Sequence, residues 1–147
     1  MPTYVVQATS GRLNAEQRQA IAREITRAHS SATGAQGFFA QVIFNDIPTG
    51  CHFMGGAPIE TDQIFVQGQI RAGRTSEQKK GLLDDIVASL AAITRIEKRY
   101  LWAYIADLPP GQMVEYGHVL PEPGGERAWL DSLPAEDRAY MLSFGER

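Results

Sequence analysis

Residues 63–107 read QIFVQGQIRAGRTSEQKKGLLDDIVASLAAITRIEKRYLWAYIAD, and this stretch contains strand, helix and strand patterns in succession. Residues 63–70 and 101–107 are rich in β-branched and aromatic side chains, which is typical of strands. Between them, a helix predicted to open at Thr75 or Ser76 carries apolar residues at helical spacing: Leu82, Leu83, Ile86, Leu90 and Ile93. The stretch therefore predicts a β-α-β unit with parallel strands.

The same pattern occurs once more, nearer the amino terminus. PTYVVQA (2–8) and AQVIFND (40–46) have strand composition, and they flank a helix predicted from about Asn14 to His29. Asn14 fits a capping box with the glutamine three residues later, and Gly34 is a helix stop signal. Apolar residues recur on one face of this helix: Ile21, Ile25 and Ala28.

The two units align at one offset of 61 residues without gaps, so that Glu16-Gln17 falls on Glu77-Gln78 and Tyr4 on Phe65. This register indicates a duplication. The sequence predicts an α/β fold in which duplicated β-α-β units form a four-stranded sheet with two helices on one face. We expect a single domain, 1–147, made of pseudo-repeats at about 2–46 and 63–107 and a C-terminal extension, 108–147.

Strands 64–66 and 101–106 are apolar on both sides of the pleat, although two helices cover only one face. A bare apolar sheet face predicts a partner, and a second copy of the chain is the simplest one. In the extension, MVEYGHVL (113–120) has a strand–Gly–strand pattern and EPGGE (122–126) is a turn. Residues 135–144 are expected to form a short terminal helix or an arm.

The composition excludes several classes of function. The formal net charge of −3 over 147 residues gives no basic footprint for nucleic acid, and no apolar run approaches the roughly 20 residues that span a membrane. Cys51 is the only cysteine, so no internal disulfide can form and a cytoplasmic location is expected. Cys51 and His52 are neighbours without a second ligand pair, so no metal site is predicted.

Pro2 becomes the amino terminus if Met1 is removed. A terminal proline is a secondary amine, and an α-amino group has a reference pKa of about 7.7–8.0, so it can act as acid or base near neutral pH. A retained Met1 would turn this amine into an amide without basicity. By itself, the residue is equally compatible with no chemical role.

Arg71 and Arg74 lie where a strand ends and a helix begins, in RAGRT (71–75). Two guanidinium groups beside a helix N-terminus can clamp a carboxylate, but two solvated arginines on a surface loop would look the same. The segment lacks the glycine pattern of a phosphate loop.

Three further side chains have open interpretations. His29, near a predicted helix end, can cap that helix or serve a site. Tyr104 shares a strand face with Trp102 and fits a core tyrosine. Glu115, in the apolar context MVEYG, can act as a general base or simply point outward from a strand.

Taken together, the amino-terminal proline, the duplicated β-α-β unit and the RxGR loop resemble the tautomerase superfamily. The length and the MVEYG segment resemble cis-3-chloroacrylic acid dehalogenase and its close homologues. The resemblance runs over nearly the whole chain, through these segments: MPTY, ITRAH, TGAQGF, AQVIF, IRAGRT, WAYIADLP, QMVEYG and WLDSLP.

The resemblance implies a catalytic set consisting of Pro2, His29, Arg71, Arg74, Tyr104 and Glu115. It also implies a trimer, and catalysis without metal or organic cofactor. The chain departs from the dehalogenase at Ala35 and Phe39, where threonine and leucine are expected in the substrate pocket, and at His118, where arginine is expected.

The implied function is hydration, or hydrolytic dehalogenation, of short 3-substituted unsaturated acids. Arg71, Arg74 and His29 would hold the substrate carboxylate, Glu115 and Tyr104 would activate water, and Pro2 would deliver a proton. The alternative is keto–enol tautomerisation of a 2-oxo acid such as phenylpyruvate, which needs neutral Pro2 and the arginines but not Glu115. A binding protein with an inactive site is a third interpretation.

Overall fold

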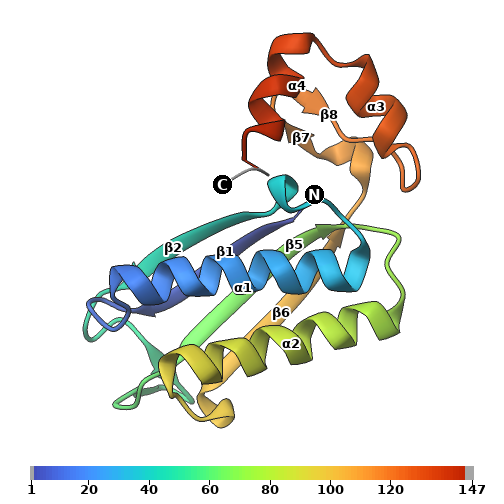
Figure 1. Ribbon diagram of the computed structural model, residues 1–147. Helices are drawn as coiled ribbons and strands as arrows, with labels where there is room; N and C mark the ends of the chain where they lie inside the picture. The colour runs from blue at the N-terminus through green and yellow to red at the C-terminus, as the bar shows by residue number, and fades with distance from the viewer. Residues whose placement is uncertain (1, 145–147) are drawn as a thin grey trace.

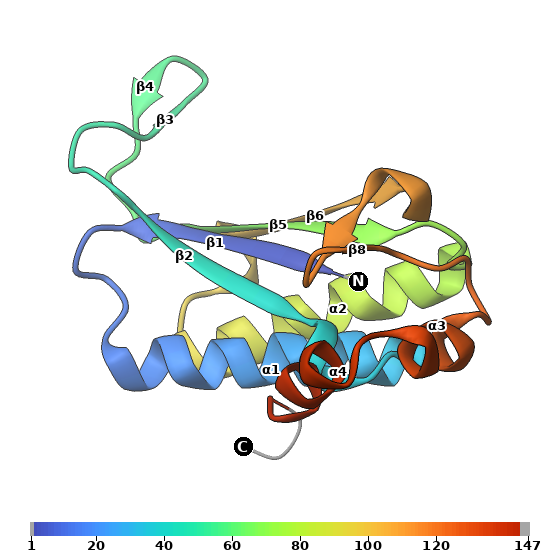
Figure 2. The same ribbon diagram turned by 90° about the horizontal axis from the view of Figure 1, so that it is seen from above.

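The computed structural model describes residues 2–144, so Met1 and residues 145–147 lie outside the described part. A four-stranded sheet lies behind two long helices, and the C-terminal extension forms a smaller lobe at one end of the sheet (Figure 1). Figure 2 shows both long helices on the same side of the sheet. The predicted α/β class and its layering are confirmed, while the extent of the domain, 1–147, stays a prediction.

Both predicted β-α-β units are present. The first consists of β1 (Thr3–Thr9), α1 (Ala15–Thr33) and β2 (Gln41–Ile47). The second consists of β5 (Ile64–Arg71), α2 (Ser76–Thr94) and β6 (Leu101–Leu108). A short 3-10 turn precedes the last strand of each unit: η1 (Gly37–Phe39) and η2 (Lys98–Tyr100). The two units therefore match in every element.

Both long helices begin with a capping box. The Asn14 side chain accepts from the Gln17 N–H at 2.8 Å, and the Gln17 side chain accepts from the Asn14 N–H at 3.1 Å. Thr75 and Gln78 repeat this exchange at the start of α2. These reciprocal bonds satisfy backbone donors that the first helical turn leaves free, which fixes where each helix starts.

Helix α1 runs one turn further than the sequence predicted, to Thr33 rather than about His29. The Thr33 hydroxyl donates to the His29 carbonyl at 2.7 Å within this added turn. Gly34 then ends the helix in the left-handed conformation, with φ of 72°, and donates to the Ser30 carbonyl at 2.8 Å. The predicted stop signal is therefore correct, and His29 lies inside the helix.

The strand order in the sheet is β2-β1-β5-β6. Pairing is parallel within each unit and antiparallel between β1 and β5 at the centre, where Thr3 lies opposite Gln69 and Ala8 opposite Ile64. Because the central strands run in opposite directions, the start of β1 lies at the same end of the sheet as the end of β5. That end also receives the C-terminal lobe (Figure 1).

The main core lies between the sheet and the two helices. It contains side chains that alternate along the strands together with the apolar stripes of α1 and α2, as the periodicity predicted. Its most deeply buried members include Tyr4, Val6, Ile21, Ile25, Ile64, Val66, Ile70, Leu82, Ile86 and Leu90.

The opposite face of the sheet is not covered by either long helix (Figure 2). Trp102 and Tyr104 lie on it with ring centroids 6.3 Å apart, and Phe65 packs against Tyr104 at 5.0 Å. Tyr104 is 55% exposed, so the interpretation of this residue as a core tyrosine is wrong. The face carries polar residues as well, because Gln67 and Gln69 alternate with buried positions on β5.

The connection between the two units contains a hairpin that the sequence analysis did not predict. Its strands are β3 (Phe53–Met54) and β4 (Ala57–Pro58), joined through Gly55 and Gly56. The hairpin projects well beyond the sheet (Figure 2), and Phe53 and Met54 are exposed on it. Two-residue strands give too short an alternating pattern to be recognised in sequence.

The C-terminal lobe contains the predicted hairpin and two helices rather than one. After the turn η3 (Pro110–Gln112), the hairpin pairs β7 (Val114–Glu115) with β8 (His118–Val119). The helices are α3 (Glu126–Ser132) and α4 (Ala135–Leu142). Met141 is fully buried in a second core together with Phe38, Phe39, Met113, Leu120 and Leu133. The expected terminal arm is thus an integral part of this chain's own packing.

A glycine in the centre of β5 makes room for Tyr4. Gly68 lies opposite Tyr4 in the sheet, and a Cβ at this position would come within 2.5 Å of the Tyr4 ring. We expect Gly68→Ala to lower the free energy of unfolding by about 1–3 kcal/mol, because the buried ring has to shift. Denaturant unfolding checks this.

Gly81→Ala is the matched control for this substitution. Gly81 lies on α2, and its Cβ would meet nothing within 4 Å. Alanine should stabilise the helix there by about 0.5–1 kcal/mol. Equal effects of the two substitutions would contradict the tight contact between Gly68 and Tyr4.

Candidate active site

Four of the predicted site residues come from elements that meet at one end of the sheet. Pro2 directly precedes β1, His29 lies in the last third of α1, Arg71 ends β5 and Arg74 precedes α2. The antiparallel register, with Thr3 opposite Gln69, places Pro2 and Arg71 at the same edge. Sequence positions separated by about seventy residues thus become neighbours through the central strand pair.

Pro2 is fully buried at this edge. Its carbonyl accepts a hydrogen bond of 3.0 Å from the Gln41 N–H, which extends the pairing of β1 with β2 by one residue. Met1, whose removal would free the Pro2 amine, lies outside the described part. The basicity of Pro2 therefore stays a prediction.

Arg71 is almost completely buried, with 3% of its surface exposed. Its Nη1 donates to the Pro121 carbonyl at 2.9 Å, and its Nη2 donates to the Glu126 carboxylate. Its Nε is buried and makes no hydrogen bond in the described structure. A buried cation is tolerated when it is paired, and Glu126 supplies the pairing charge. The interpretation of Arg71 as a solvated surface arginine is wrong.

Arg74 is partly buried, and its pKa is lowered by that burial and by the neighbouring Arg71 charge. Arg71 and Arg74 line one cavity of about 540 Å³, with Ala35 and Phe39 on the same wall and Glu126 on α3. We call this the arginine cavity. Ala35 and Phe39 thus line the same cavity as both arginines, and their contact with a substrate stays a prediction.

His29 is buried, with 3% of its surface exposed, and its Nδ1 is 2.8 Å from the Tyr4 hydroxyl. Burial, together with the charges of Arg74 and Arg71, lowers the pKa of His29 to about 4. His29 is therefore neutral at pH 7. A neutral imidazole cannot favour the helix dipole as a cation, so the capping interpretation is wrong. It can exchange hydrogen bonds with a ligand without adding charge.

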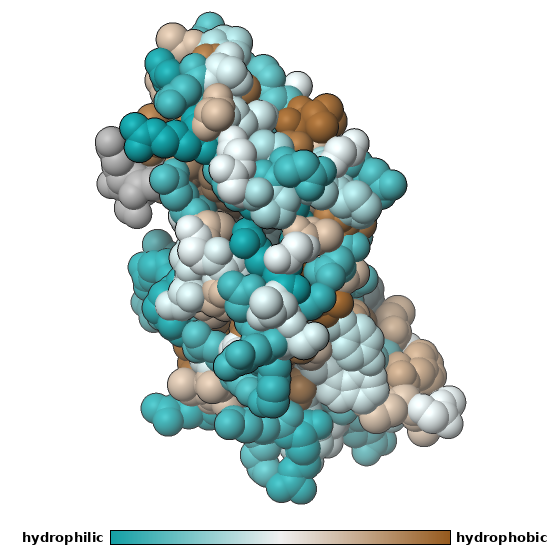
Figure 3. All heavy atoms as spheres, turned by 90° about the vertical axis from the view of Figure 1, so that its right-hand side faces the viewer, coloured by the Kyte–Doolittle hydropathy of each residue, from teal (hydrophilic) through white to brown (hydrophobic). Residues whose placement is uncertain are grey.

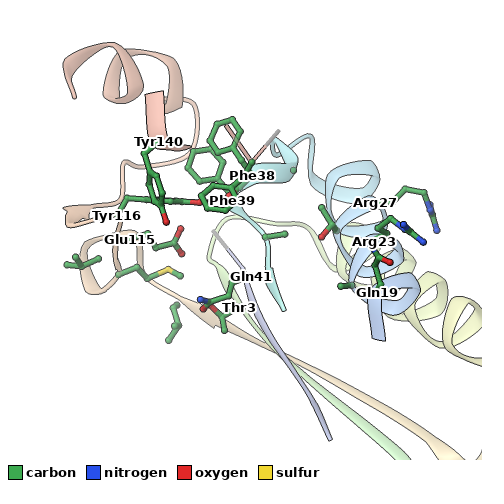
Figure 4. A pocket seen from close by; sticks show the side chains of 18 of the residues that line it. Thr3, Gln19, Arg23, Arg27, Phe38, Phe39, Gln41, Glu115, Tyr116 and Tyr140 are labelled. Atoms are coloured by element: carbon green, nitrogen blue, oxygen red, sulfur yellow. Dashed lines mark hydrogen bonds between the residues drawn. The ribbon is translucent and has the colours of Figure 1, made fainter. Parts of the chain in front are cut away.

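Glu115 lies in a second and larger cleft of about 1120 Å³ between α1, η1 and the C-terminal lobe. Figure 4 shows its carboxylate beside Tyr116 and Tyr140, with Phe38 and Phe39 of η1 nearby and the arginines of α1 on the far wall. Phe39 lines both this cleft and the arginine cavity. Glu115 and the two arginines therefore line different cavities, and Phe39 lies at both.

Tyr104 is not part of either cavity. It lines a small hollow of about 210 Å³ on the uncovered sheet face, next to Phe65, Trp102 and the β3–β4 hairpin. It pairs with Gln67, four residues before Arg71. Tyr104 therefore lies part-way along its strand, and not at the end of the sheet where the arginines lie. A single chain therefore does not bring Tyr104 to the arginines.

The structure adds residues that sequence reasoning missed. The Tyr4 hydroxyl forms a hydrogen bond with His29. In the sequence, Tyr4 was notable only as a member of a predicted strand. Glu126 and Pro121 hold Arg71 from fifty or more residues away, so no local pattern could connect them. His118, where the resemblance implied arginine, is 2.7 Å from the Asp137 carboxylate and ties the β7–β8 hairpin to α4.

Residues 2–144 contain neither a candidate metal site nor a candidate membrane span. No group of three His, Cys, Asp or Glu side chains lies close enough to hold a metal ion. None of the described helices combines the length and the apolar character that crossing a membrane requires. The face shown in Figure 3 is largely hydrophilic, and its hydrophobic side chains form small separate patches.

Comparison with known proteins agrees with this fold. Residues 1–132 match the family model described as "Putative oxalocrotonate tautomerase enzyme". The chain belongs to the tautomerase superfamily.

Within that class, the similarity extends to a cis-3-chloroacrylic acid dehalogenase family member. The crystal structure of N1, a member of that family, matches with a TM-score of 0.91 and 33% identity, over 96% of this chain and 99% of the other. "Probable tautomerase LL0574" of Lactococcus lactis subsp. lactis (strain IL1403) is 43% identical over 56 residues, 38% of this chain and 90% of the relative.

A more distant neighbour shares the fold. The "F6 fused 4-OT wild type asymmetric trimer" has a TM-score of 0.74 at 22% identity, covering 86% of this chain and 98% of the other.

The lowered pKa of His29 predicts a dependence of stability on pH. Between the folded pKa of about 4 and the unfolded value of about 6.5, the unfolded chain binds a proton that the folded chain does not. The free energy of unfolding should therefore fall as the pH is lowered through this window, by about 2–3 kcal/mol from His29 alone.

Urea unfolding at several pH values between 7.5 and 4.5 measures this effect. Because carboxylates also titrate in acid, the comparison is between the wild type and His29→Gln, which should lack the His29 part. The same slope in both proteins would contradict a buried, neutral histidine.

Proposed function

We propose that the protein is a cofactor-independent enzyme that adds water across the double bond of a short 3-substituted unsaturated acid. The arginine cavity is the observation that carries this proposal. It combines Arg71, which is almost completely buried, with the partly buried Arg74, and two guanidinium groups removed from water in this way are a setting for one small carboxylate.

The proposed reaction gives roles to four of the six predicted residues. Arg74 and Arg71 bind the substrate carboxylate and withdraw electron density from the double bond. Glu115 removes a proton from water, whose oxygen bonds to the β-carbon, and protonated Pro2 gives its proton to the α-carbon. With a halogen on the β-carbon, the adduct loses hydrogen halide and leaves malonate semialdehyde. No metal ion or organic cofactor is required, since the arginines provide the electrophilic pull.

Glu115 needs a path to the arginine cavity for this reaction. Phe39 lines both the cleft that holds Glu115 and the arginine cavity, so a rotation of this one ring would join them. We propose that Phe39 and Ala35 determine which substituents the acid can carry, because they line the cavity next to the arginines.

Tyr104 can take part only if the protein assembles. It is more than half exposed on the uncovered sheet face, and neither the arginine cavity nor the cleft that holds Glu115 reaches it. We propose a homotrimer in which Tyr104 of one protomer completes the site of the next. The exposed rings on that face and the trimeric state of the fused 4-OT neighbour support this assembly.

The second candidate is a tautomerase of 2-oxo acids such as phenylpyruvate. The similarity to a probable tautomerase favours it, and Pro2 with the two arginines would be sufficient. The two reactions differ in their need for Glu115, and this makes them separable by one substitution.

Glu115→Gln keeps the shape of the side chain but removes the base. We expect it to reduce turnover of a 3-haloacrylate or propynoate by about 10²–10⁴-fold and to leave phenylpyruvate tautomerisation largely unchanged. Steady-state assays of both reactions check this, on protein whose intact mass shows that Met1 is absent. Equal loss of both activities would make Glu115 structural and would favour the tautomerase.

Arg74→Lys tests the carboxylate clamp. Lysine keeps the charge but lacks the planar fork, so kcat/KM for the best carboxylate substrate should fall about 10–100-fold. Arg99→Lys, at an exposed pair with Glu97, is the control and should be neutral. Full activity of Arg74→Lys would contradict the proposed geometry.

A further inference from the structure

Glu126, on the first turn of α3, contacts the arginine that the proposed function assigns to the substrate. Arg71 Nη2 donates to Oε1 of Glu126, and the Gly124 N–H donates to Oε2 at 2.9 Å. Both carboxylate oxygens are therefore held in place. The pKa of Glu126 is lowered: burial would raise it, but the bonds from Arg71 and from nearby backbone N–H groups outweigh that effect.

The loops that carry the two partners also pack against each other. Gly73, between the two arginines, has a φ of 106°, and a Cβ there would lie 2.9 Å from Pro123 Cγ. Pro121, two residues earlier, accepts from Arg71 Nη1 at 2.9 Å. Segment 121–126 thus fixes both the backbone of the RAGRT loop and the guanidinium group of Arg71.

One donor of Arg71 is left over. Nη1 and Nη2 are engaged, whereas Nε is buried without a hydrogen-bond partner in residues 2–144. An unsatisfied buried donor is unfavourable, and a carboxylate oxygen of a ligand would satisfy it. Pro121 and Glu126 together therefore engage both Nη groups of Arg71, so that this arginine does not offer a free fork to a ligand.

The charges that line the arginine cavity follow from the same contact. Arg71 is neutralised by Glu126, and Arg127 pairs with Asp131 at 3.9 Å across an exposed turn of α3. His29 is neutral at pH 7. Among the described side chains lining the cavity, Arg74 is then the cation without an ion pair.

We infer that Glu126 is the positioning residue of Arg71, and that its charge makes the cavity a receptor for one carboxylate group rather than two. This inference rests on the proposed function for its ligand, a short acid. It adds that the C-terminal extension, and not the duplicated units alone, determines how many negative charges the site accepts.

Two substitutions at Glu126 separate position from charge. Glu126→Gln removes the charge and keeps the length, and Glu126→Asp keeps the charge but is too short to contact both Arg71 and the Gly124 N–H. Glu122→Gln is the control, since it removes the same charge four residues earlier, where the side chain makes no hydrogen bond or ion pair with Arg71. Circular dichroism verifies that each variant is folded.

The first measurement needs no ligand. Nitrogen-15 NMR of the arginine side chains, with the Arg71 signals assigned by their loss in Arg71→Lys, reports rotation of the guanidinium group. The wild type and Glu122→Gln should show slow rotation of Arg71, with separate Nη signals, and both Glu126 variants should show fast rotation. Slow rotation retained in Glu126→Gln would overturn the positioning role.

The second measurement uses acrylate and maleate, a mono- and a dicarboxylate, with calorimetry to obtain their dissociation constants. In Glu126→Gln the affinity ratio of maleate to acrylate should rise about tenfold relative to the wild type, which corresponds to about 1.4 kcal/mol. Glu122→Gln and Glu126→Asp should keep the wild-type ratio.

Two results would overturn the inference about charge. Tighter acrylate binding by Glu126→Gln, without a change of the ratio, would mean that Glu126 competes with the ligand. An equal rise of the ratio in Glu122→Gln would mean that any nearby charge has the same effect. If the wild type binds neither acid, the proposed function fails together with the charge role, and the NMR result still decides the positioning role.

Discussion

The antiparallel pairing of β1 with β5 is the constraint on which the rest of the molecule depends. It joins two β-α-β units that are internally parallel, and it fixes which ends of the strands coincide. Tyr4 packs over Gly68 in this pair, and its hydroxyl reaches His29 on α1. A shift of one residue would turn Tyr4 to the opposite face and separate Pro2 from Arg71. One register thus determines both the core and the site.

Burial of ionisable groups gives the site its chemical character. His29 responds to burial by staying neutral, since its pKa falls to about 4. Arg71 keeps its proton when buried, and the Glu126 carboxylate pairs with its charge. Arg74 is only partly buried and has no such partner among the described residues. Charge and accessibility therefore differ among Arg71 and Arg74, which line one cavity, and His29, whose pKa responds to both.

The C-terminal extension contributes residues to the candidate site and packs against the first β-α-β unit. Its two helices and its hairpin form a second core with Phe38 and Phe39, which come from the first β-α-β unit. The extension carries Glu115 on β7, and through Pro121 and Glu126 it holds Arg71. Removing the extension would leave the duplicated units with a buried arginine that lacks its counter-charge, which is strongly unfavourable.

The sequence by itself determined the elements and the repeat. Asn14 with Gln17 correctly predicted where the first helix starts. Gly34 was recognised as its stop signal, although the helix was expected to end near His29, and the β-branched and aromatic residues of 63–70 predicted a strand. These signals are local, because a cap or a strand pattern depends on side chains a few positions apart. The resemblance of short motifs identified the candidate site residues, but it did not predict which of them lie in the same cavity.

Only the tertiary structure decided which of those residues share a cavity. It placed Arg71, Arg74, Ala35 and Phe39 in one cavity, Glu115 in a second cleft, and Tyr104 on the uncovered face. It also supplied Tyr4 and Glu126, whose partners lie 25 and 55 positions away. Contacts at such separations follow from strand order and register, and these are set by burial of the whole core, so no local pattern in the sequence contains them.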